Sequence, residues 1–206
     1  MTLFGRFVSI VVGSLLLAAP VAAQHIDKAT QLRQDMRKLW TDHTVWTRDY
    51  IVAAVDDRPD AQAAANRLMK NQEDIGNAVA AYHGQAAGQQ LTSLLKQHIA
   101  IAVDLIKAAK AGNQAAQEQA NDKWQQNAVD IATSLSKANP NWPRGALVNM
   151  MKMHLATTTD EVVARLTHDW EADVRAYDAV YNHILMMADA LSDGIAKQFP
   201  EKFKAS

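Results

Sequence analysis

The chain has 206 residues, 49% of them hydrophobic, and its 21 basic and 22 acidic residues give a formal net charge of −1. A balance this close to neutral argues against nucleic acid or an anionic membrane surface as a partner, because both attract strongly basic proteins. The chain contains no cysteine, which excludes disulfides, thiolate catalysis and cysteine-ligated zinc or iron–sulfur sites.

The first 23 residues have the pattern of a secretory signal peptide. Arg6 precedes an apolar run over residues 7–19, and small residues at 21–23 suit a cleavage site. The apolar run is too short for a stable membrane span. We therefore expect cleavage after Ala23, a periplasmic or secreted location, and no stable membrane insertion afterwards. Cleavage removes one basic residue and no acidic one, so the net charge of −1 becomes −2.

Residues 24–206 are predicted to form one all-α domain. Alanine, glutamine, leucine and lysine are abundant, and alternating β-branched runs are absent. Pro59, Gly84, Gly88, Gly112 and Pro140 interrupt the helical periodicity. The pattern predicts a six-helix, up-and-down antiparallel bundle with helices over residues 25–57, 60–82, 88–111, 114–138, 144–167 and 169–198.

The second and third expected helices recur as the fourth and fifth at an offset of 56 residues. Such repetition predicts an internally duplicated helical hairpin. The matching residues are Asn71, Asp74, Ile75, Leu91, Lys96, His98, Ala100 and Asp104 in the first copy and Asn127, Asp130, Ile131, Leu147, Lys152, His154, Ala156 and Asp160 in the second.

Six polar residues are expected at one level of the folded bundle. In an antiparallel helix pair, two residues face each other when both are equally far from the turn between them. This relation holds for each successive pair in the series His43, Asp74, His98, Asp130, His154 and His183. Each histidine also lies on an apolar stripe with three- and four-residue spacing, so its ring should point inward.

Four imidazoles and two carboxylates can ligate a transition metal, so we expect a metal site in the middle of the bundle. Copper or zinc comes first and iron next, with storage, delivery or sensing of the ion as the role. Another extracytoplasmic protein is a further candidate partner. The expected metal residues are His43, His98, His154 and His183, with Asp74 and Asp130 as ligands or as acceptors that orient the rings.

Two alternative functions stay open. A buried histidine–aspartate layer could fix helix register without binding anything, in a structural or interaction module. A metal ion with an open coordination position could instead support an enzyme. The sequence has no Glu-x-x-His pair, His-Glu-x-x-His motif, phosphate-binding glycine loop or nucleophile elbow, so it indicates no catalytic residue and no nucleotide. The absence of Cys-x-x-Cys-His excludes covalently attached haem, and we do not expect haem otherwise.

Methionines gather near two of the histidines. Helices 144–167 and 169–198 carry them within a turn of His154 and His183, where a copper(I) site of methionine and histidine is conceivable. Met150 and Met151 stand at the positions of Leu94 and Leu95 in the first copy, which favours core packing. The methionines concerned are Met150, Met151, Met153, Met186 and Met187.

Four stretches carry a resemblance to a known group of proteins. They are Leu39-Trp40 through His43 to Trp46-Thr47-Arg48, Asn71 to Ala78, Asn139-Pro140-Asn141-Trp142, and Met187-Ala188-Asp189 through Gly194-Ile195 to Gln198-Phe199-Pro200. The chain after residue 23 resembles, over nearly its whole length, a family of small, often secreted, all-helical bacterial proteins without established function. Some relatives carry transferase names, but the sheet-based donor site and acidic metal motif of a nucleotide-sugar transferase are missing here. The resemblance implies a discrete bacterial domain and transfers no active site.

Overall fold

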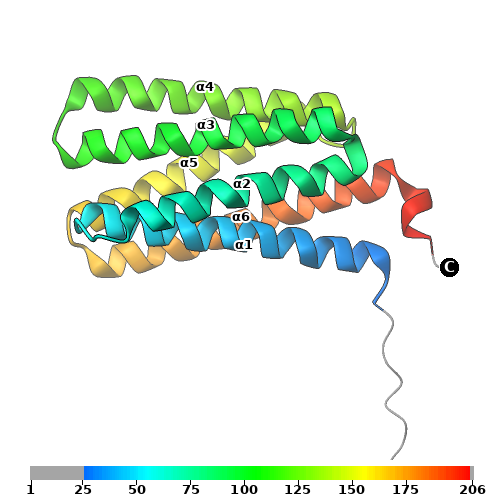
Figure 1. The fold of residues 1–206 in the computed structure, drawn as a ribbon, viewed down its shortest axis with the longest axis horizontal. Coiled ribbons are helices and arrows are strands. Elements are labelled where there is room, and N and C mark those ends of the chain that lie inside the picture. Colours follow the sequence, from blue (N-terminus) through cyan, green and yellow to red (C-terminus); the bar gives the residue numbers. More distant parts are fainter. Residues whose placement is uncertain (1–25, 205–206) are drawn as a thin grey trace, which may run out of the picture.

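A computed structural model describes residues 26–204, which form an all-helical bundle (Figure 1). The predicted signal peptide lies outside the described residues. The elements within 26–204 are α1 (Lys28–Val55), α2 (Ala61–His83), α3 (Gln85–Lys110), α4 (Gln114–Ala138), α5 (Arg144–Leu166), α6 (Trp170–Gln198) and the 3₁₀ turn η1 (Pro200–Phe203). The predicted all-α class and the number of long helices are confirmed for this part of the chain.

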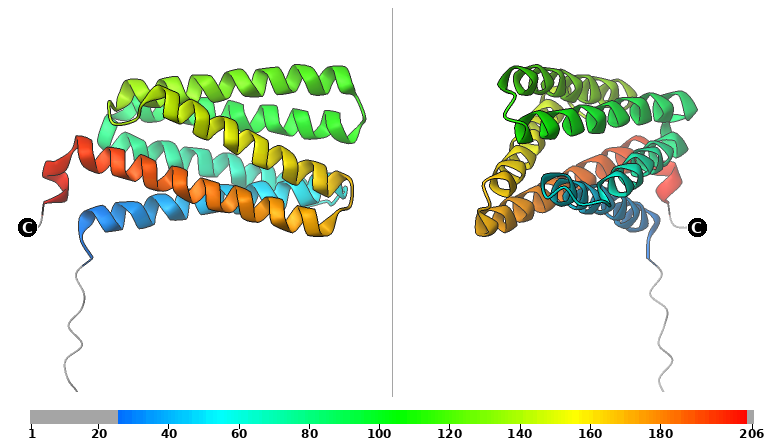
Figure 2. Two further views of the ribbon diagram at one scale, coloured as in Figure 1. Left: turned by 180° about the vertical axis from the view of Figure 1, so that it is seen from behind. Right: turned by 60° about the vertical axis from the view of Figure 1, so that its left-hand side comes forward.

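The helices run up and down, and each packs against the next along the chain. The last helix, α6, packs back against α1. Figures 1 and 2 show the α3–α4 hairpin on one side of the bundle, with α5 crossing obliquely from the end of α4 to α6. Between residues 26 and 204, no helix combines the length and apolar character that a membrane span requires.

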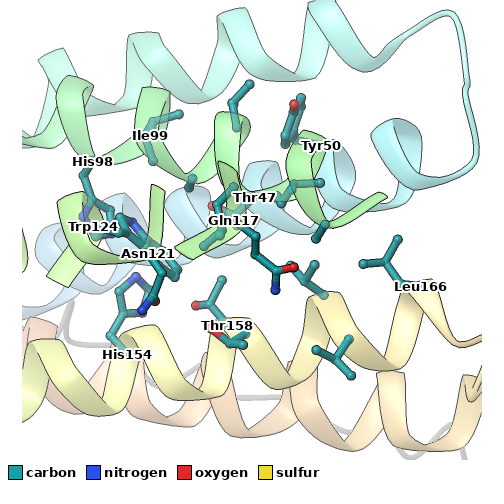
Figure 3. Close-up of a pocket in the computed structure, with 18 of the residues that line it drawn as sticks. Thr47, Tyr50, His98, Ile99, Gln117, Asn121, Trp124, His154, Thr158 and Leu166 are labelled. Carbon is teal, nitrogen blue, oxygen red and sulfur yellow. The ribbon is translucent and has the colours of Figure 1, made fainter. Parts of the chain in front are cut away.

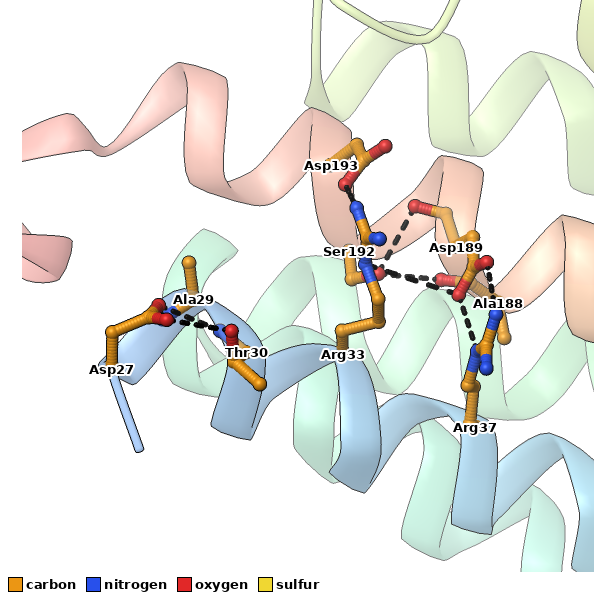
Figure 4. A network of polar contacts seen from close by, with 9 residues as sticks. All are labelled: Asp27, Ala29, Thr30, Arg33, Arg37, Ala188, Asp189, Ser192 and Asp193. Carbon is orange, nitrogen blue, oxygen red and sulfur yellow. Dashed lines mark hydrogen bonds and ion pairs between the residues drawn. The ribbon is translucent and has the colours of Figure 1, made fainter. Parts of the chain in front are cut away.

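Side chains fix several helix ends. The Asp27 carboxylate accepts hydrogen bonds from the backbone N–H groups of Ala29 and Thr30 at 3.0 and 2.9 Å, which caps the start of α1 (Figure 4). Near this end, the Arg37 guanidinium binds the Asp189 carboxylate on α6 with a 2.7 Å Nε–Oδ1 distance. The Arg37–Asp189 contact joins the first and last helices of the bundle.

Glycine marks both a turn and a close helix contact between α2 and α3. Gly84 has a φ of 85° and separates the two helices. Gly88 was predicted to interrupt the helical pattern, and this is wrong because α3 begins at Gln85 and continues through Gly88. A Cβ atom on Gly88 would lie only 2.6 Å from the Gly76 carbonyl oxygen on α2. Gly88 is therefore required for close packing of the two helices.

The buried core repeats three times, with a period of 55 or 56 residues. The hairpins α1–α2, α3–α4 and α5–α6 are equivalent in this repetition, so the predicted duplication is part of a longer, threefold series. Corresponding buried residues are Met36, Leu91 and Leu147; Trp40, Leu95 and Met151; Ile75, Ile131 and Met187; and Val79, Leu135 and Leu191. Met151 and Met187 thus occupy core positions, whereas Met153 and Met186 are exposed.

A buried ion-pair network joins α1 to the third hairpin. Arg48 on α1 donates to Glu161 on α5 at 3.0 Å and to Asp173 on α6 at 2.6 Å. Both carboxylates are almost fully buried. Burial raises the pKa of Glu161 to about 7, against the opposing influence of Arg48. Arg48 thus holds three helices together.

The close contact between α2 and α3 generates a stability prediction. Gly88→Ala is expected to destabilise the fold by about 1–3 kcal/mol, because the new methyl group meets backbone and the Ala80 side chain. Gly145→Ala is the matched control, since a Cβ atom there meets nothing within 4 Å. It should stabilise by up to about 1 kcal/mol through lower chain entropy. Urea unfolding of both variants tests this, and equal stabilisation by the two substitutions would contradict it.

Candidate functional site

The structure brings the four predicted histidines together inside the bundle. The His154 ring is central, with its centroid 5.8 Å from His43, 5.9 Å from His98 and 6.5 Å from His183. All four residues are buried, with at most 7% of their surface exposed. Helix spacing therefore predicted correctly that these rings share one level of the core.

The structure does not bring Asp74 and Asp130 into this group, which corrects the expected support for the rings. The Asp74 side chain is 34% exposed and lies 3.4 Å from the Lys70 ammonium. Asp130 is exposed and accepts a hydrogen bond from Gln126 at 3.0 Å. Both aspartates lie near the right level, but their helices turn neutral amides inward instead, because a buried carboxylate would need a compensating charge.

His98 has partners for both ring nitrogens. The Trp124 indole N–H donates to His98 Nε2 at 3.1 Å, so Nε2 accepts and the ring proton resides on Nδ1. His98 Nδ1 donates in turn to the Asn127 side-chain oxygen at 2.8 Å. Asn127 is fixed in this orientation because its NH₂ group donates to the Leu94 carbonyl at 3.0 Å. His98 is therefore a fully satisfied core histidine.

His43 is held in the opposite tautomer. The Gln72 NH₂ group donates to the Leu68 carbonyl at 2.7 Å and lies 3.3 Å from His43 Nδ1. An NH₂ group can only donate, so His43 Nδ1 accepts and its ring proton resides on Nε2. The neighbouring Asn71 donates to the Leu39 carbonyl at 2.9 Å. Each of the first two hairpins thus has an asparagine on its second helix that donates to the carbonyl four residues before the histidine of its first helix.

The third hairpin departs from this arrangement at one residue. His183 stands where the repeat has Asn71 and Asn127, and its Nε2 lies 2.9 Å from the Met150 carbonyl, four residues before His154. A carbonyl accepts, so His183 Nε2 carries the proton and donates it there. His183 has no amide oxygen to offer to the next ring. Within the described residues, His154 Nδ1 is buried without a hydrogen-bond partner.

Burial keeps the imidazoles uncharged. It lowers the pKa of His43 to about 3 and that of His98 to about 4, with further lowering at His43 from the nearby His98 ring. Burial and the three surrounding imidazoles hold the pKa of His154 well below its usual value. At neutral pH these three side chains are therefore neutral hydrogen-bonding groups.

A cavity of about 280 Å³ adjoins the histidine layer (Figure 3). Its walls come mainly from α1, α3, α4 and α5, with Leu68 of α2, and Figure 3 shows His98 and Ile99 facing His154 and Thr158 across it. The first helix of each hairpin contributes its histidine and the residue one turn later. These equivalent lining residues are His43 and Thr47, His98 and Ala102, and His154 and Thr158.

The cavity is apolar apart from a few uncharged groups. No aspartate, glutamate, lysine or arginine of residues 26–204 lines it. The hydroxyl groups of Thr47 and Thr158 are buried without a partner in the described protein. By contrast, Thr157 and Thr159 donate to carbonyls three or four residues earlier in their own helix. The Thr47 and Thr158 hydroxyls are thus left available at the cavity.

The histidine layer does not form an evident three-ligand metal centre. Over residues 26–204, no group of three or more histidine, aspartate or glutamate side chains is arranged to hold a metal ion. Both nitrogens of His98 are engaged, and His43 Nδ1 is used by Gln72. The nitrogens left for further interactions belong mainly to His154 and His183.

Comparison with protein-family models found no match, and comparisons with curated proteins and with solved structures found none either. The resemblance to a bacterial helical family therefore stays an expectation from sequence. The geometry of this chain alone carries the functional argument.

Several functional residues were not identified from the sequence. Gln72, Trp124 and Thr158 resemble ordinary helix residues in the pattern, since nothing in their spacing separates them from core or surface. Asn127 had a detectable signal, because it recurs with Asn71 in the internal repeat. The adjacent aspartates were preferred as stronger partners for imidazole, although the neutral amides occupy the inward positions.

The neutral histidines predict acid destabilisation. The pKa values of His43 and His98 are about 3 and 4 in the folded chain, against an ordinary value of 6.5. As the pH falls below 6.5, the unfolded chain therefore binds protons first, and stability is lost towards the folded pKa values. Each histidine should contribute about 1.4 kcal/mol per pH unit within that window.

Glu161 acts in the opposite direction. Its folded pKa of about 7 lies above the ordinary 4.5, so it adds stability as the pH falls through this range. We expect the unfolding free energy in urea to fall between about pH 6.5 and about pH 4.5, and to fall more steeply in Glu161→Gln. A wild-type free energy that stays constant or rises over this range would contradict neutral burial of the histidines.

Proposed function

We propose that the protein binds a small, uncharged and largely apolar organic molecule in the cavity beside the histidine layer. One observation carries the proposal. Three buried polar atoms have no partner within residues 26–204, and all three belong to residues that line one apolar cavity: the Thr47 and Thr158 hydroxyls and His154 Nδ1. Leaving each such atom unpaired costs about 1–3 kcal/mol. A ligand with a hydrogen-bonding group would offset part of this cost.

The cavity has a size that suits such a ligand. Its volume of about 280 Å³ is roughly twice that of a 150 Å³ apolar protein cavity known to hold benzene. Ile99, Leu105, Ile106 and Val162 offer apolar surface to the body of the ligand. An apolar cavity with a few convergent polar groups is the usual form of a small-molecule site.

The residues that line the cavity disfavour a charged ligand. No ionised side chain of residues 26–204 lines the cavity, and its three histidines are neutral. A carboxylate or ammonium group would lose its hydration without gaining a counter-charge. A hydroxyl, carbonyl or similar neutral group would instead pair with the threonine hydroxyls, which can both donate and accept.

The α4 side of the cavity offers a route for the ligand. Gln117 and Asn121 line the cavity and are exposed to solvent, and Val163 on α5 is half exposed. These residues lie on α4 and α5, and Figure 3 shows Gln117 and Asn121 beside the cavity. A ligand entering there would meet polar side chains at the surface and the histidine layer at the inner end.

A set of eight-carbon probes tests the proposal. We expect 1-octanol to raise the unfolding free energy of the protein, by about 2.7 kcal/mol at one hundred times its dissociation constant. Octanoate and octylammonium, which share the chain but carry a charge, should bind at least about tenfold more weakly because of the desolvation cost. Isothermal titration gives the three affinities.

Two variants locate the binding. Ala102→Phe places a ring in the cavity and should abolish octanol binding, whereas Ala86→Phe adds the same ring at an exposed position of α3 and should not. Failure of octanol to bind, or equal binding by the Ala102→Phe and wild-type proteins, would overturn the proposed site. Equal binding of the charged and neutral probes would overturn the proposed ligand class.

A further inference from the structure

A single substitution within the internal repeat distinguishes the third hairpin. In the first two hairpins, Asn71 and Asn127 each donate to the carbonyl four residues before the histidine of their hairpin. His183 makes the same contact in the third. Asparagine can donate through its NH₂ group and accept through its oxygen at once, as Asn127 does with His98. A neutral imidazole that donates through Nε2 keeps only the Nδ1 lone pair.

Two ring nitrogens become available as a result. His183 Nδ1 is released for another interaction by the hydrogen bond from Nε2 to the Met150 carbonyl. Metal-bound histidines commonly have this arrangement, in which the distal N–H donates to a backbone carbonyl and orients the ring. His154 Nδ1 is buried without a partner in the described chain.

The spacing of these two near-parallel rings leaves room for one shared ion. Their centroids lie 6.5 Å apart, and their planes differ by 14°. A metal–nitrogen distance of about 2.0 Å on each side would separate the centroids by about 6 Å in a linear arrangement. Side-chain rotation that turns both Nδ1 atoms towards the ion would complete this arrangement. A tetrahedral zinc site would need two more ligands, which the engaged rings of His43 and His98 do not readily supply.

The charge of the surroundings favours a monovalent ion. Asp74 and Asp130 lie outside the cluster, so the pair contains no anionic ligand. Burying a divalent ion among neutral groups is costly, and a single positive charge costs less. The setting is also polarisable, because Met150 and Met187 lie one turn from His154 and His183 in and around the core.

We infer that His154 and His183 form a two-coordinate site for a soft monovalent metal ion of the copper(I) class. This site shares His154 with the proposed ligand cavity, which His183 does not line. The third hairpin thereby exchanges a satisfied asparagine–histidine pair for a pair of metal-binding imidazoles.

His183→Asn is the decisive variant, because asparagine is the residue that the other two hairpins use at this position. It should fold, since it restores the repeated carbonyl contact and offers an oxygen to His154. Copper(I), added anaerobically as its acetonitrile complex, should bind one ion per wild-type chain and none per His183→Asn chain in native mass spectrometry. His83→Asn, which changes a histidine outside the cluster, should still bind one.

The variant also separates this inference from the proposed cavity ligand, because the Thr47 and Thr158 hydroxyls stay available in His183→Asn and octanol should still bind. In nitrogen-15 spectra, copper(I) should shift His183 Nδ1 and leave its Nε2 proton in place. Absence of copper(I) binding by the wild type would overturn the inference. Undiminished binding by His183→Asn, or stoichiometric zinc(II) binding in place of copper(I), would overturn it as well.

Discussion

In each hairpin, a side chain of the second helix donates a hydrogen bond to the carbonyl one turn before the inward histidine of the first helix, and the rest of the core is aligned by this contact. Asn71, Asn127 and His183 make it in the three hairpins, at distances of 2.9, 3.0 and 2.9 Å. Each carbonyl already accepts within its own helix and has a second lone pair to offer. The contact fixes the register of the two helices of a hairpin. Three hairpins with the same register then bring their histidines to one level of the bundle.

The residues that depart from the repeat leave unpaired polar groups around His154. Trp124 and Asn127 satisfy His98 completely, whereas His183 leaves His154 with an unpaired nitrogen. One turn later the first and third hairpins carry threonine, and their hydroxyls adjoin the same cavity. Natural folds tolerate such unsatisfied groups where they are used. His154 therefore stands between two proposed sites, the cavity on one side and the His183 ring on the other.

The sequence was sufficient for the helices and for the level of the histidines, because turn positions and apolar stripes determine both. It did not determine which side chains α2 and α4 direct inward at the polar layer. Asp74 and Asp130 were therefore expected where Asn71, Gln72 and Asn127 lie. Gly88 was assigned to a turn because close helix contact leaves no separate sequence signal. The cavity was also unpredictable, since Ile99 and Ala102 have the same character as core residues. It depends on the oblique path of α5, which is a property of the packed bundle (Figure 2).

The ring tautomers test this account most directly, because the contrast between satisfied and unsatisfied histidines rests on them. Long-range proton–nitrogen-15 spectra of the unliganded protein at neutral pH report which nitrogen of each ring carries the proton. The account predicts a proton on Nδ1 of His98, which accepts from Trp124 through Nε2, and on Nε2 of His183, which donates to Met150. A proton on Nε2 of His98 or on Nδ1 of His183 would contradict it.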